Sequence, residues 1–224
     1  MVSARHSLIV FDWDGTLMDS AGKIVACFQA AARDLDLPVP DAALIEHQIG
    51  LTLEIAWSNV FASLRLGETP ALLKSASERY RDYFLEIDTT PMPLYSGVKE
   101  GLQQLEDAGY LLAVATGKAR RGLQRALQGT DLHTHFVYTR CADESHSKPH
   151  PQMLLDTLDF CGCEADRALM VGDTTYDMQM ARNAGIDGLA VSYGVHPEQR
   201  LRPLASMGCA ASFTEVIERI HPDG

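Results

Sequence analysis

The amino-acid sequence predicts an α/β protein with a doubly wound, Rossmann-like parallel-sheet core and an inserted all-helical cap domain. After residue 95, apolar runs of strand length alternate with amphipathic helical segments, as in a parallel sheet with crossover helices. Several of these runs end directly in polar residues. The segment from about residue 20 to residue 92 has only helical periodicity, which indicates an insertion after the first strand.

The first strand is predicted at Leu8–Phe11, a short apolar run typical of a buried parallel strand. Asp12 and Asp14 follow it, and Gly15 permits a tight turn beside them. Ligands of open α/β sheets bind outside the carboxyl ends of the strands, so we expect both carboxylates at a ligand site. Their mutual repulsion requires a compensating cation or proton, which favours a hard metal ion such as Mg²⁺.

The other core elements are predicted from apolar periodicity and from the glycines that end helices. Pro151 lies in a first-turn position of its helix, where the missing N–H costs nothing. We expect the last strand of the sheet at 188–192. In chain order the predicted elements are helix 97–108, strand 110–115, helix 119–128, strand 135–139, helix 150–161, strand 168–172, helix 175–184, strand 188–192 and helix 213–220.

The predicted cap domain covers residues 20–92, and the predicted core domain combines residues 1–19 with 93–224. A stiff connection with two prolines, Thr89–Pro93, ends the insertion. A helical lid above the strand ends suits a reaction that must exclude water. The helical patterns of the cap are an amphipathic helix with Ile24, Phe28, Ala31 and Leu35 on one face, and further segments at 42–47, 52–65 and 70–87.

Composition restricts the class of protein. The 224 residues carry a formal net charge of -11, which argues against nucleic-acid or anionic-membrane partners because these need a basic surface. No apolar run approaches the ~20 residues of a membrane span, and Leu8–Phe11 is too short for a signal-peptide core. The five cysteines are scattered and odd in number, which favours a reducing, cytoplasmic location over a disulfide framework.

A second polar segment, Thr116-Gly117-Lys118, follows the predicted strand 110–115. A hydroxyl and free backbone N–H groups ahead of a helix can form an anion site. The alternative is that Thr116 only caps the helix that begins near Ala119. A nucleotide P-loop is excluded, because Leu112 stands where its first glycine would be and Ala119 where its metal-binding Ser or Thr would be.

Two further segments place charged residues at the same edge of the sheet. Lys148 lies between Ser147 and two nearby prolines, in a loop ahead of a helix, where it is either solvated or able to face a carboxylate cluster. Asp173 leaves strand 168–172, and Asp177 follows one helical turn later. Both acids could simply stabilise a helix start. Four such segments converging on one edge favour a shared site.

These residues resemble the four motifs of the haloacid-dehalogenase superfamily: Asp12-x-Asp14-Gly15-Thr16, Thr116, Lys148, and Gly172-Asp173-x-x-x-Asp177, in this order. The helical insertion resembles that superfamily's smaller, helical (C1-type) cap, so the likeness covers nearly the whole chain. Within the superfamily, Phe11–Ser20 resembles the opening of bacterial phosphoglycolate-phosphatase-like hydrolases, with Trp13 where leucine is commoner.

The resemblance implies a Mg²⁺-dependent phosphoric monoester phosphatase that acts on a small phosphorylated metabolite. It implies that Asp12 attacks phosphorus and forms an aspartyl-phosphate intermediate. Asp14 would protonate the leaving alkoxide and then activate the hydrolytic water. Lys148 would offset the repulsion between the anionic nucleophile and the anionic substrate.

The resemblance also implies a metal site and a phosphate site. The Mg²⁺ ligands would be the Asp12 carboxylate, the Asp14 backbone carbonyl and Asp173, with Asp177 orienting Lys148 or a metal-bound water. The phosphoryl oxygens are expected to lie against Thr116, Lys148 and the backbone N–H groups near Trp13, Asp14 and Gly117.

Differences between this sequence and related subfamilies disfavour some of the activities found in the superfamily. Dehalogenases have a tyrosine at the position of Asp14, so halide displacement is disfavoured. Mutases of the superfamily carry a basic cap loop, whereas the corresponding His47–Thr52 has neither Arg nor Lys. A sugar phosphomutase and a non-catalytic module that binds a phosphorylated ligand are the two alternatives to a phosphatase.

The sequence leaves the substrate open among phosphoglycolate, sugar phosphates, nucleotides and pyrophosphate, and it leaves a monomer and a homodimer equally open. Cap residues near Lys23, Trp57 and the segment 49–51 are the candidates for contact with the leaving group. His196 is assigned either a structural role or a place at the site rim. Cys161 and Cys163 lack a second ligand pair and are interpreted as incidental thiols.

Overall fold

The strand β1 (Leu8–Phe11) occupies the middle of a six-stranded sheet, and all four of its residues are buried. The structure, a computed structural model, describes residues 5–221, so residues 1–4 and 222–224 of the predicted core lie outside the described residues. β1 pairs in parallel with β2 (Leu111–Thr116) and with β4 (Ala168–Gly172). The full order is β3-β2-β1-β4-β5-β6 with every pair parallel, which confirms the predicted doubly wound sheet.

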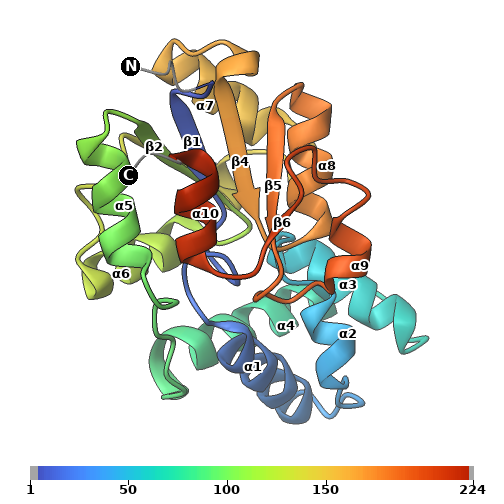
Figure 1. Cartoon of the computed structure of the whole chain (residues 1–224). Coiled ribbons are helices and arrows are strands. Elements are labelled where there is room, and N and C mark those ends of the chain that lie inside the picture. Colours follow the sequence, from blue (N-terminus) through green and yellow to red (C-terminus); the bar gives the residue numbers. More distant parts are fainter. Residues whose placement is uncertain (1–4, 222–224) are drawn as a thin grey trace.

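Helices cover both faces of this sheet (Figure 1). Side chains of α5, α6 and α10 pack with one face, and those of α7 and α8 with the other. The remaining strands are β3 (Tyr138–Cys141), β5 (Asp187–Val191) and β6 (Cys209–Ala210). The core helices are α5 (Val98–Asp107), α6 (Arg120–Thr130), α7 (Gln152–Cys161), α8 (Thr175–Ala184), α9 (Glu198–Leu201) and α10 (Phe213–Ile220), with 3-10 turns at Ala142–Glu144 and Ala165–Arg167.

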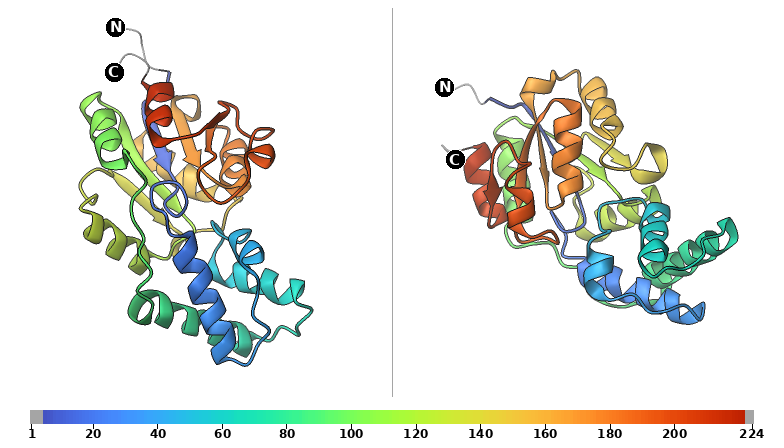
Figure 2. Two further views of the ribbon diagram at one scale, coloured as in Figure 1. Left: turned by 60° about the horizontal axis from the view of Figure 1, so that its bottom comes forward. Right: turned by 90° about the vertical axis from the view of Figure 1, so that its right-hand side faces the viewer.

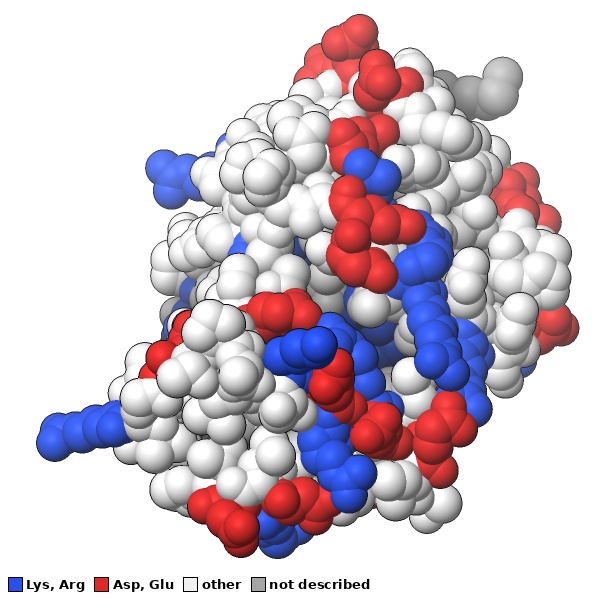
Figure 3. Space-filling view, turned by 180° about the vertical axis from the view of Figure 1, so that it is seen from behind, with Lys and Arg blue, Asp and Glu red and all other residues white. Residues whose placement is uncertain are grey.

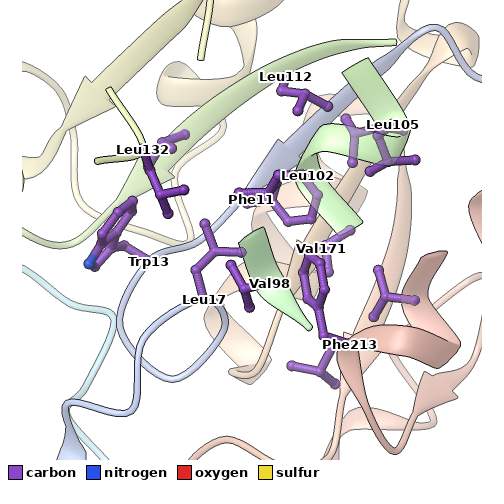
Figure 4. Close-up of a cluster of buried hydrophobic side chains, with 14 of the residues drawn as sticks. Phe11, Trp13, Leu17, Val98, Leu102, Leu105, Leu112, Leu132, Val171 and Phe213 are labelled. Atoms are coloured by element: carbon purple, nitrogen blue, oxygen red, sulfur yellow. The ribbon is translucent and has the colours of Figure 1, made fainter. Parts of the chain in front are cut away.

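The main hydrophobic core lies between the sheet and α5, α6 and α10. Figure 4 shows Phe11 and Val171 of the sheet beside Leu102 of α5 and Phe213 of α10. The rings of Phe11 and Phe213 lie 6.0 Å apart. Each such side chain contributes about 1.5–3 kcal/mol on full burial. This packing fixes β1, and therefore the position of Asp12 directly after it.

Alternate residues of β1 face the opposite layer, where Leu8 and Val10 pack with Met153 of α7 and Met180 of α8. Because both faces of the strand are covered, its sequence is a continuous apolar run instead of an alternating one. This burial is the physical reason that the first polar residue, Asp12, marks the end of the strand.

A second group of helices lies between β1 and β2 in the sequence and sits at the carboxyl edge of the sheet (Figure 2). These cap helices pack around their own apolar cluster, which includes Phe28, Trp57 and Phe61. The Phe28 and Trp57 ring centres are 4.5 Å apart. The helices are α1 (Ala21–Asp34), α2 (Ala42–Glu46), α3 (Leu53–Ser63) and α4 (Pro70–Asp82), followed by a π-helical turn at Tyr83–Ile87.

The structure corrects several predicted boundaries. The strand expected at 135–139 begins at Tyr138, because residues 132–135 form a turn in which the His135 N–H donates to the Leu132 carbonyl. The strand at 187–191 is not the last one, since the two-residue β6 follows and is too short to produce a periodic pattern. Pro151 is the N-cap of α7 and not a residue of its first turn.

The cap helix predicted at 70–87 also ends differently from an ordinary α-helix. Its last turn widens into the π-helical turn Tyr83–Ile87, in which the Asp88 N–H donates to the Tyr83 carbonyl at 2.8 Å. Such turns are rare and frequently lie at functional sites. Within residues 5–221, none of the helices combines the length and the apolar character needed to cross a membrane.

Candidate active site

The four polar segments singled out in the sequence meet at one place. Asp12 follows β1, Thr116 ends β2 and Asp173 follows β4, so the parallel pairing of these strands brings the three residues to the same edge. Lys148 reaches this edge from the loop ahead of α7, and Asp177 from the first turn of α8. All five are at most 1% exposed. A buried cluster of charged groups persists only when the charges are paired or bind a ligand.

Lys148 is the centre of the buried charges. Its Nζ lies 2.9 Å from Oδ1 of Asp12 and 2.6 Å from Oδ1 of Asp177. Burial alone would lower the pKa of Lys148, but the two carboxylates outweigh it and raise the pKa above its ordinary value. Lys148 is therefore an ammonium at neutral pH, held between the two acids.

Three carboxylates form a cluster that can accept a metal ion. Asp12, Asp173 and Asp177 each offer one oxygen, and these oxygens lie within 4.8 Å of one another. Oδ2 of Asp12 is buried and has no hydrogen-bond partner among residues 5–221. Oxygen ligands of this kind suit a hard divalent cation such as Mg²⁺. The residues present therefore fit the metal that the sequence predicts.

The raised pKa values of the clustered carboxyl groups also favour the binding of a cation. Burial, opposed by Lys148 and reinforced by Asp177, raises the pKa of Asp12 to about 7 in the metal-free protein. Burial, with the charges of Asp177 and Asp12, also raises the pKa of Asp173 well above its ordinary value. A bound cation would remove this penalty, because it stabilises the ionised carboxylates directly.

Asp173 is held rigidly against the turn after β1. Oδ1 accepts a hydrogen bond from the Thr16 hydroxyl at 2.9 Å, and Oδ2 accepts one from the Val195 N–H at 2.9 Å. Gly15 has φ +86°, and a Cβ there would collide with the Asp173 carboxylate. The glycine is required both for the left-handed backbone and for this close approach.

Asp177 combines the two roles that the sequence left open. It is the third residue of α8, and its Oδ2 accepts hydrogen bonds from the Thr174 N–H at 3.0 Å and the Thr174 hydroxyl at 2.7 Å. The Thr174 hydroxyl accepts in return from the Asp177 N–H, which completes a capping box. The other oxygen of Asp177 faces Lys148, so the cap also orients the ion pair.

Thr116 does not cap α6. That helix begins at Arg120 with Ala119 as its N-cap, and the Thr116 hydroxyl instead accepts from the Lys118 N–H at 3.2 Å. A Cβ on Gly117 would collide with the Gly50 carbonyl, so this glycine allows the cap loop to approach the core backbone. The Trp13 side chain packs in the core, and only its backbone is available to a ligand (Figure 4).

The arrangement around Asp14 was not predicted in full. Lys118 Nζ lies 2.9 Å from both carboxylate oxygens of Asp14, and the Ser20 hydroxyl donates to Oδ1 at 2.7 Å. The sequence signal for Lys118 was its place directly after Thr116-Gly117. Ser20 had no such signal, because its contact depends on the turn that returns the chain toward Asp14.

A cavity of about 590 Å³ opens in front of Asp12 and Asp14, between core and cap. Of the predicted cap residues, Ile49, Gly50 and Leu51 line it. Trp57 instead packs in the cap core, and Lys23 donates to the Asp88 carbonyl at 2.7 Å with its Nζ 5.3 Å from the Phe84 ring centre. The cap loop thus closes the space directly above the buried carboxylates.

His196 is buried beside the site, outside this cavity. Its Nδ1 accepts from the Thr175 N–H at 3.0 Å, and its ring stacks on His47 of the cap with centres 5.1 Å apart. Burial, together with the nearby charge of Arg200, lowers the pKa of His196 to about 4. The imidazole is therefore neutral at pH 7 and acts as a packing contact between cap and core.

Two phosphatases resemble this chain over nearly its full length. The chain is 36% identical over 217 residues to a protein named "Probable phosphatase IndB" from Dickeya dadantii, covering 96% of this chain and 93% of that protein. It is 34% identical over 222 residues to a phosphoglycolate phosphatase from Mesorhizobium japonicum, covering 95% and 96% of the two chains.

Solved structures give the same result for the fold. A haloacid dehalogenase-like family hydrolase from Streptococcus pneumoniae superposes with a TM-score of 0.81 at 26% identity, covering 95% of this chain and 97% of that one. The family model for haloacid dehalogenase-like hydrolases matches residues 9–191, which include every residue predicted to act in catalysis, metal binding or phosphate binding. The chain therefore belongs to the haloacid dehalogenase-like hydrolase family.

Proposed function

We propose that this protein is a Mg²⁺-dependent phosphomonoester phosphatase that works through a phosphoryl group carried by Asp12. The observation that carries the proposal is the buried Asp12 carboxylate, which faces the cavity with Oδ2 unpartnered among residues 5–221. Lys148 lies beside its other oxygen, and Asp173 and Asp177 lie close by. The phosphatase names of the two relatives described above support the same reaction class.

The first step transfers the phosphoryl group to the protein. A carboxylate oxygen of Asp12 attacks phosphorus, and the bond between phosphorus and the ester oxygen breaks. Asp14, two residues further on, gives its proton to the departing alkoxide. Both side chains line the cavity, so a phosphate bound there contacts the nucleophile and the acid together.

The second step returns the phosphoryl group to water. Asp14, now ionised, takes a proton from a water molecule that attacks the phosphorus of the aspartyl phosphate. The bond from Asp12 to phosphorus breaks, and inorganic phosphate leaves with the Asp12 carboxylate restored. The hydrogen bond from the Ser20 hydroxyl holds the Asp14 carboxylate in a fixed place for both proton transfers.

Mg²⁺ would be held by Asp12, Asp173 and the Asp14 backbone carbonyl, and it would supply positive charge that offsets the phosphoryl oxygens. Lys148 supplies a second positive charge at the nucleophile, where two anions must approach each other. Thr116 and the backbone N–H groups around Trp13 and Gly117 would orient the phosphoryl oxygens. The cap loop approaches the core backbone at Gly117 and would limit the access of bulk water to this space.

A decisive experiment measures phosphate release from a panel of phosphomonoesters, with and without Mg²⁺, for the wild type and for Asp12→Asn. We expect release that requires Mg²⁺ and is lost in the variant, while the thermal unfolding of the variant shows a folded protein. Retained turnover in Asp12→Asn would exclude the mechanism. An isomerised, still phosphorylated product would indicate a mutase, and tight binding without turnover would indicate a binding module.

A further inference from the structure

The residues that line the cavity above Asp12 indicate which class of substrate binds there. This inference rests on the phosphatase activity proposed above. Its volume is about 590 Å³. Part of its lining is apolar and comes from the cap, including Phe28 of α1, Leu53 of α3 and Phe84 of the π-helical turn. Specific pockets place a few polar groups against a mainly apolar and aromatic wall, so these side chains define the environment of the leaving group.

The volume is large for a short substrate. A water molecule in the liquid occupies about 30 Å³, so about nine non-hydrogen atoms, the number in phosphoglycolate, account for less than half of the cavity. Phe28 is only 3% exposed, with its ring against Trp57 and Tyr80, so Leu53 and the half-buried Phe84 are the more accessible apolar lining side chains. A two-carbon leaving group would leave this wall in contact with water.

The charges that line the cavity disfavour a second anion. Lys118 has the least exposed basic side chain among the described lining residues, at 8%, and it already faces Asp14 at 2.9 Å. The two lining arginines lie at the exposed rim, Arg81 at 2.7 Å from Glu54 and Arg121 at 3.5 Å from Glu86. Besides Asp12 and Asp14, the acidic lining residues are Glu54, Glu78, Asp82, Glu86 and Asp143.

This excess of carboxylates has a direct electrostatic consequence. Figure 3 shows acidic and basic side chains alternating around a hollow on one face of the molecule. A carboxylate on the leaving group would enter a space with more fixed negative than positive charge, and it would compete with Asp14 for Lys118. Desolvating an anion without a free cation is costly.

We propose that the cavity selects phosphate monoesters of an uncharged, ring-bearing alcohol, with the ring packed against the apolar cap residues Leu53 and Phe84. A short carboxylate such as glycolate is the disfavoured leaving group. A hexose phosphate and a nucleotide both have an uncharged leaving group that contains a ring. Their relative rates of hydrolysis distinguish these two kinds of substrate.

The test compares kcat/KM with Mg²⁺ for acetyl phosphate, phosphoglycolate, glucose 6-phosphate and adenosine 5′-monophosphate. Acetyl phosphate is too small to need the apolar wall and its acetate leaves without a proton, so its hydrolysis reports phosphoryl transfer through Asp12 alone. We expect glucose 6-phosphate or adenosine 5′-monophosphate to exceed phosphoglycolate by at least about tenfold, the scale set by a few apolar contacts. The compound with the higher kcat/KM of these two shows whether the preferred substrate is a sugar phosphate or a nucleotide.

A cavity-filling variant tests the position of the ring. Leu53→Trp reduces the space of the cavity, and we expect kcat/KM for the preferred ring ester to fall about tenfold, with a clearly smaller loss for acetyl phosphate. Ile55→Trp is the matched control, because Ile55 lies on the same helix, is 41% exposed and does not line the cavity. The control should leave both substrates unchanged.

Reversing the charge of one acidic lining residue tests whether the excess of carboxylates disfavours an anionic leaving group. An exposed residue is chosen so that the packing of the cap is not disturbed. Glu78 is 59% exposed at its side chain and lines the cavity, so Glu78→Lys is expected to fold. It should raise the ratio of kcat/KM for phosphoglycolate over that for acetyl phosphate, most strongly at low ionic strength.

The outcomes separate the two proposals. No hydrolysis of any of the four compounds would overturn the proposed function itself. Hydrolysis of acetyl phosphate together with a preference for phosphoglycolate over both ring esters would overturn only the inference on the substrate. Equal losses on acetyl phosphate and the ring ester in a folded Leu53→Trp protein would also overturn it.

Discussion

The Lys118 ammonium lies 2.9 Å from both carboxylate oxygens of Asp14 and 4.6 Å from the centre of the Phe84 ring. It therefore joins the proposed acid–base residue of the core to the π-helical turn of the cap. Side-chain exposures of 8% and 10% for Lys118 and Asp14 show that the ion pair is largely removed from water. Such a pair responds strongly to the loss of one partner, because the other charge stays buried.

Replacement of Lys118 by Met is expected to lower the free energy of unfolding by about 1–3 kcal/mol, since the Asp14 carboxylate would keep Ser20 as its hydrogen-bond donor and lose its cation. Chemical denaturation measures this change. The matched control is Lys74→Met, because Lys74 is 75% exposed and lies 3.8 Å from Glu78, a pair worth little in solvent. Equal decreases in the free energy of unfolding for the two substitutions would contradict a stabilising role of the buried pair of Lys118 and Asp14.

Asp14→Ala is expected to separate good leaving groups from poor ones. If Asp14 protonates the departing oxygen, the loss of kcat should be largest for alkyl phosphates, which leave as basic alkoxides. An activated aryl phosphate leaves without a proton and should lose less activity. A steady-state comparison of an alkyl and an aryl phosphate checks this difference, and equal losses would exclude the acid role.

Mg²⁺ is expected to stabilise the protein more at high pH than at low pH. Asp12 has an ordinary pKa of 3.8, and burial raises it to about 7 in the metal-free fold. Between these values the folded protein binds more protons than the unfolded chain, so the metal-free protein loses stability as the pH rises. Mg²⁺ binds the ionised carboxylates and restores that stability above about pH 7.

Thermal unfolding with and without millimolar Mg²⁺ on either side of this pH measures the effect. The increase in Tm should be larger at the higher pH, and most of it should disappear in Asp173→Asn, which removes one carboxylate of the cluster. An increase that is the same at both pH values, or that survives in Asp173→Asn, would place the metal elsewhere.

Much of the core was predictable because buried parallel strands have a clear physical signature. β1 and β4 are continuous apolar runs, and the first polar residue after each, Asp12 or Asp173, lies at the edge where ligands bind. Lys148 was predictable only in combination with these acids. Its exact partners depend on the loop ahead of α7 and on the capping box of α8, which fold around it.

The contacts between cap and core could not be predicted from periodicity. The pairing of Lys118 with Asp14 and Phe84 joins residues that are distant in the sequence, and it depends on how the cap helices sit on the sheet. The π-helical turn had no sequence signal, because its residues 83–87 fit the preceding helical pattern. β6 was missed because a strand of two residues has no periodicity to detect.

The most direct test of the central claim is to trap the phosphoryl group on the protein. The enzyme is mixed with Mg²⁺ and radiolabelled acetyl phosphate, quenched in acid and digested, and the labelled peptide is identified by mass spectrometry. Asp14→Asn should increase the labelled fraction, because Asp14 is the proposed base for hydrolysis of the intermediate. Label on the peptide that contains Asp12, released by hydroxylamine and absent in Asp12→Asn, is the predicted result. Label on another residue, or turnover of Asp12→Asn at the wild-type rate, would contradict the account.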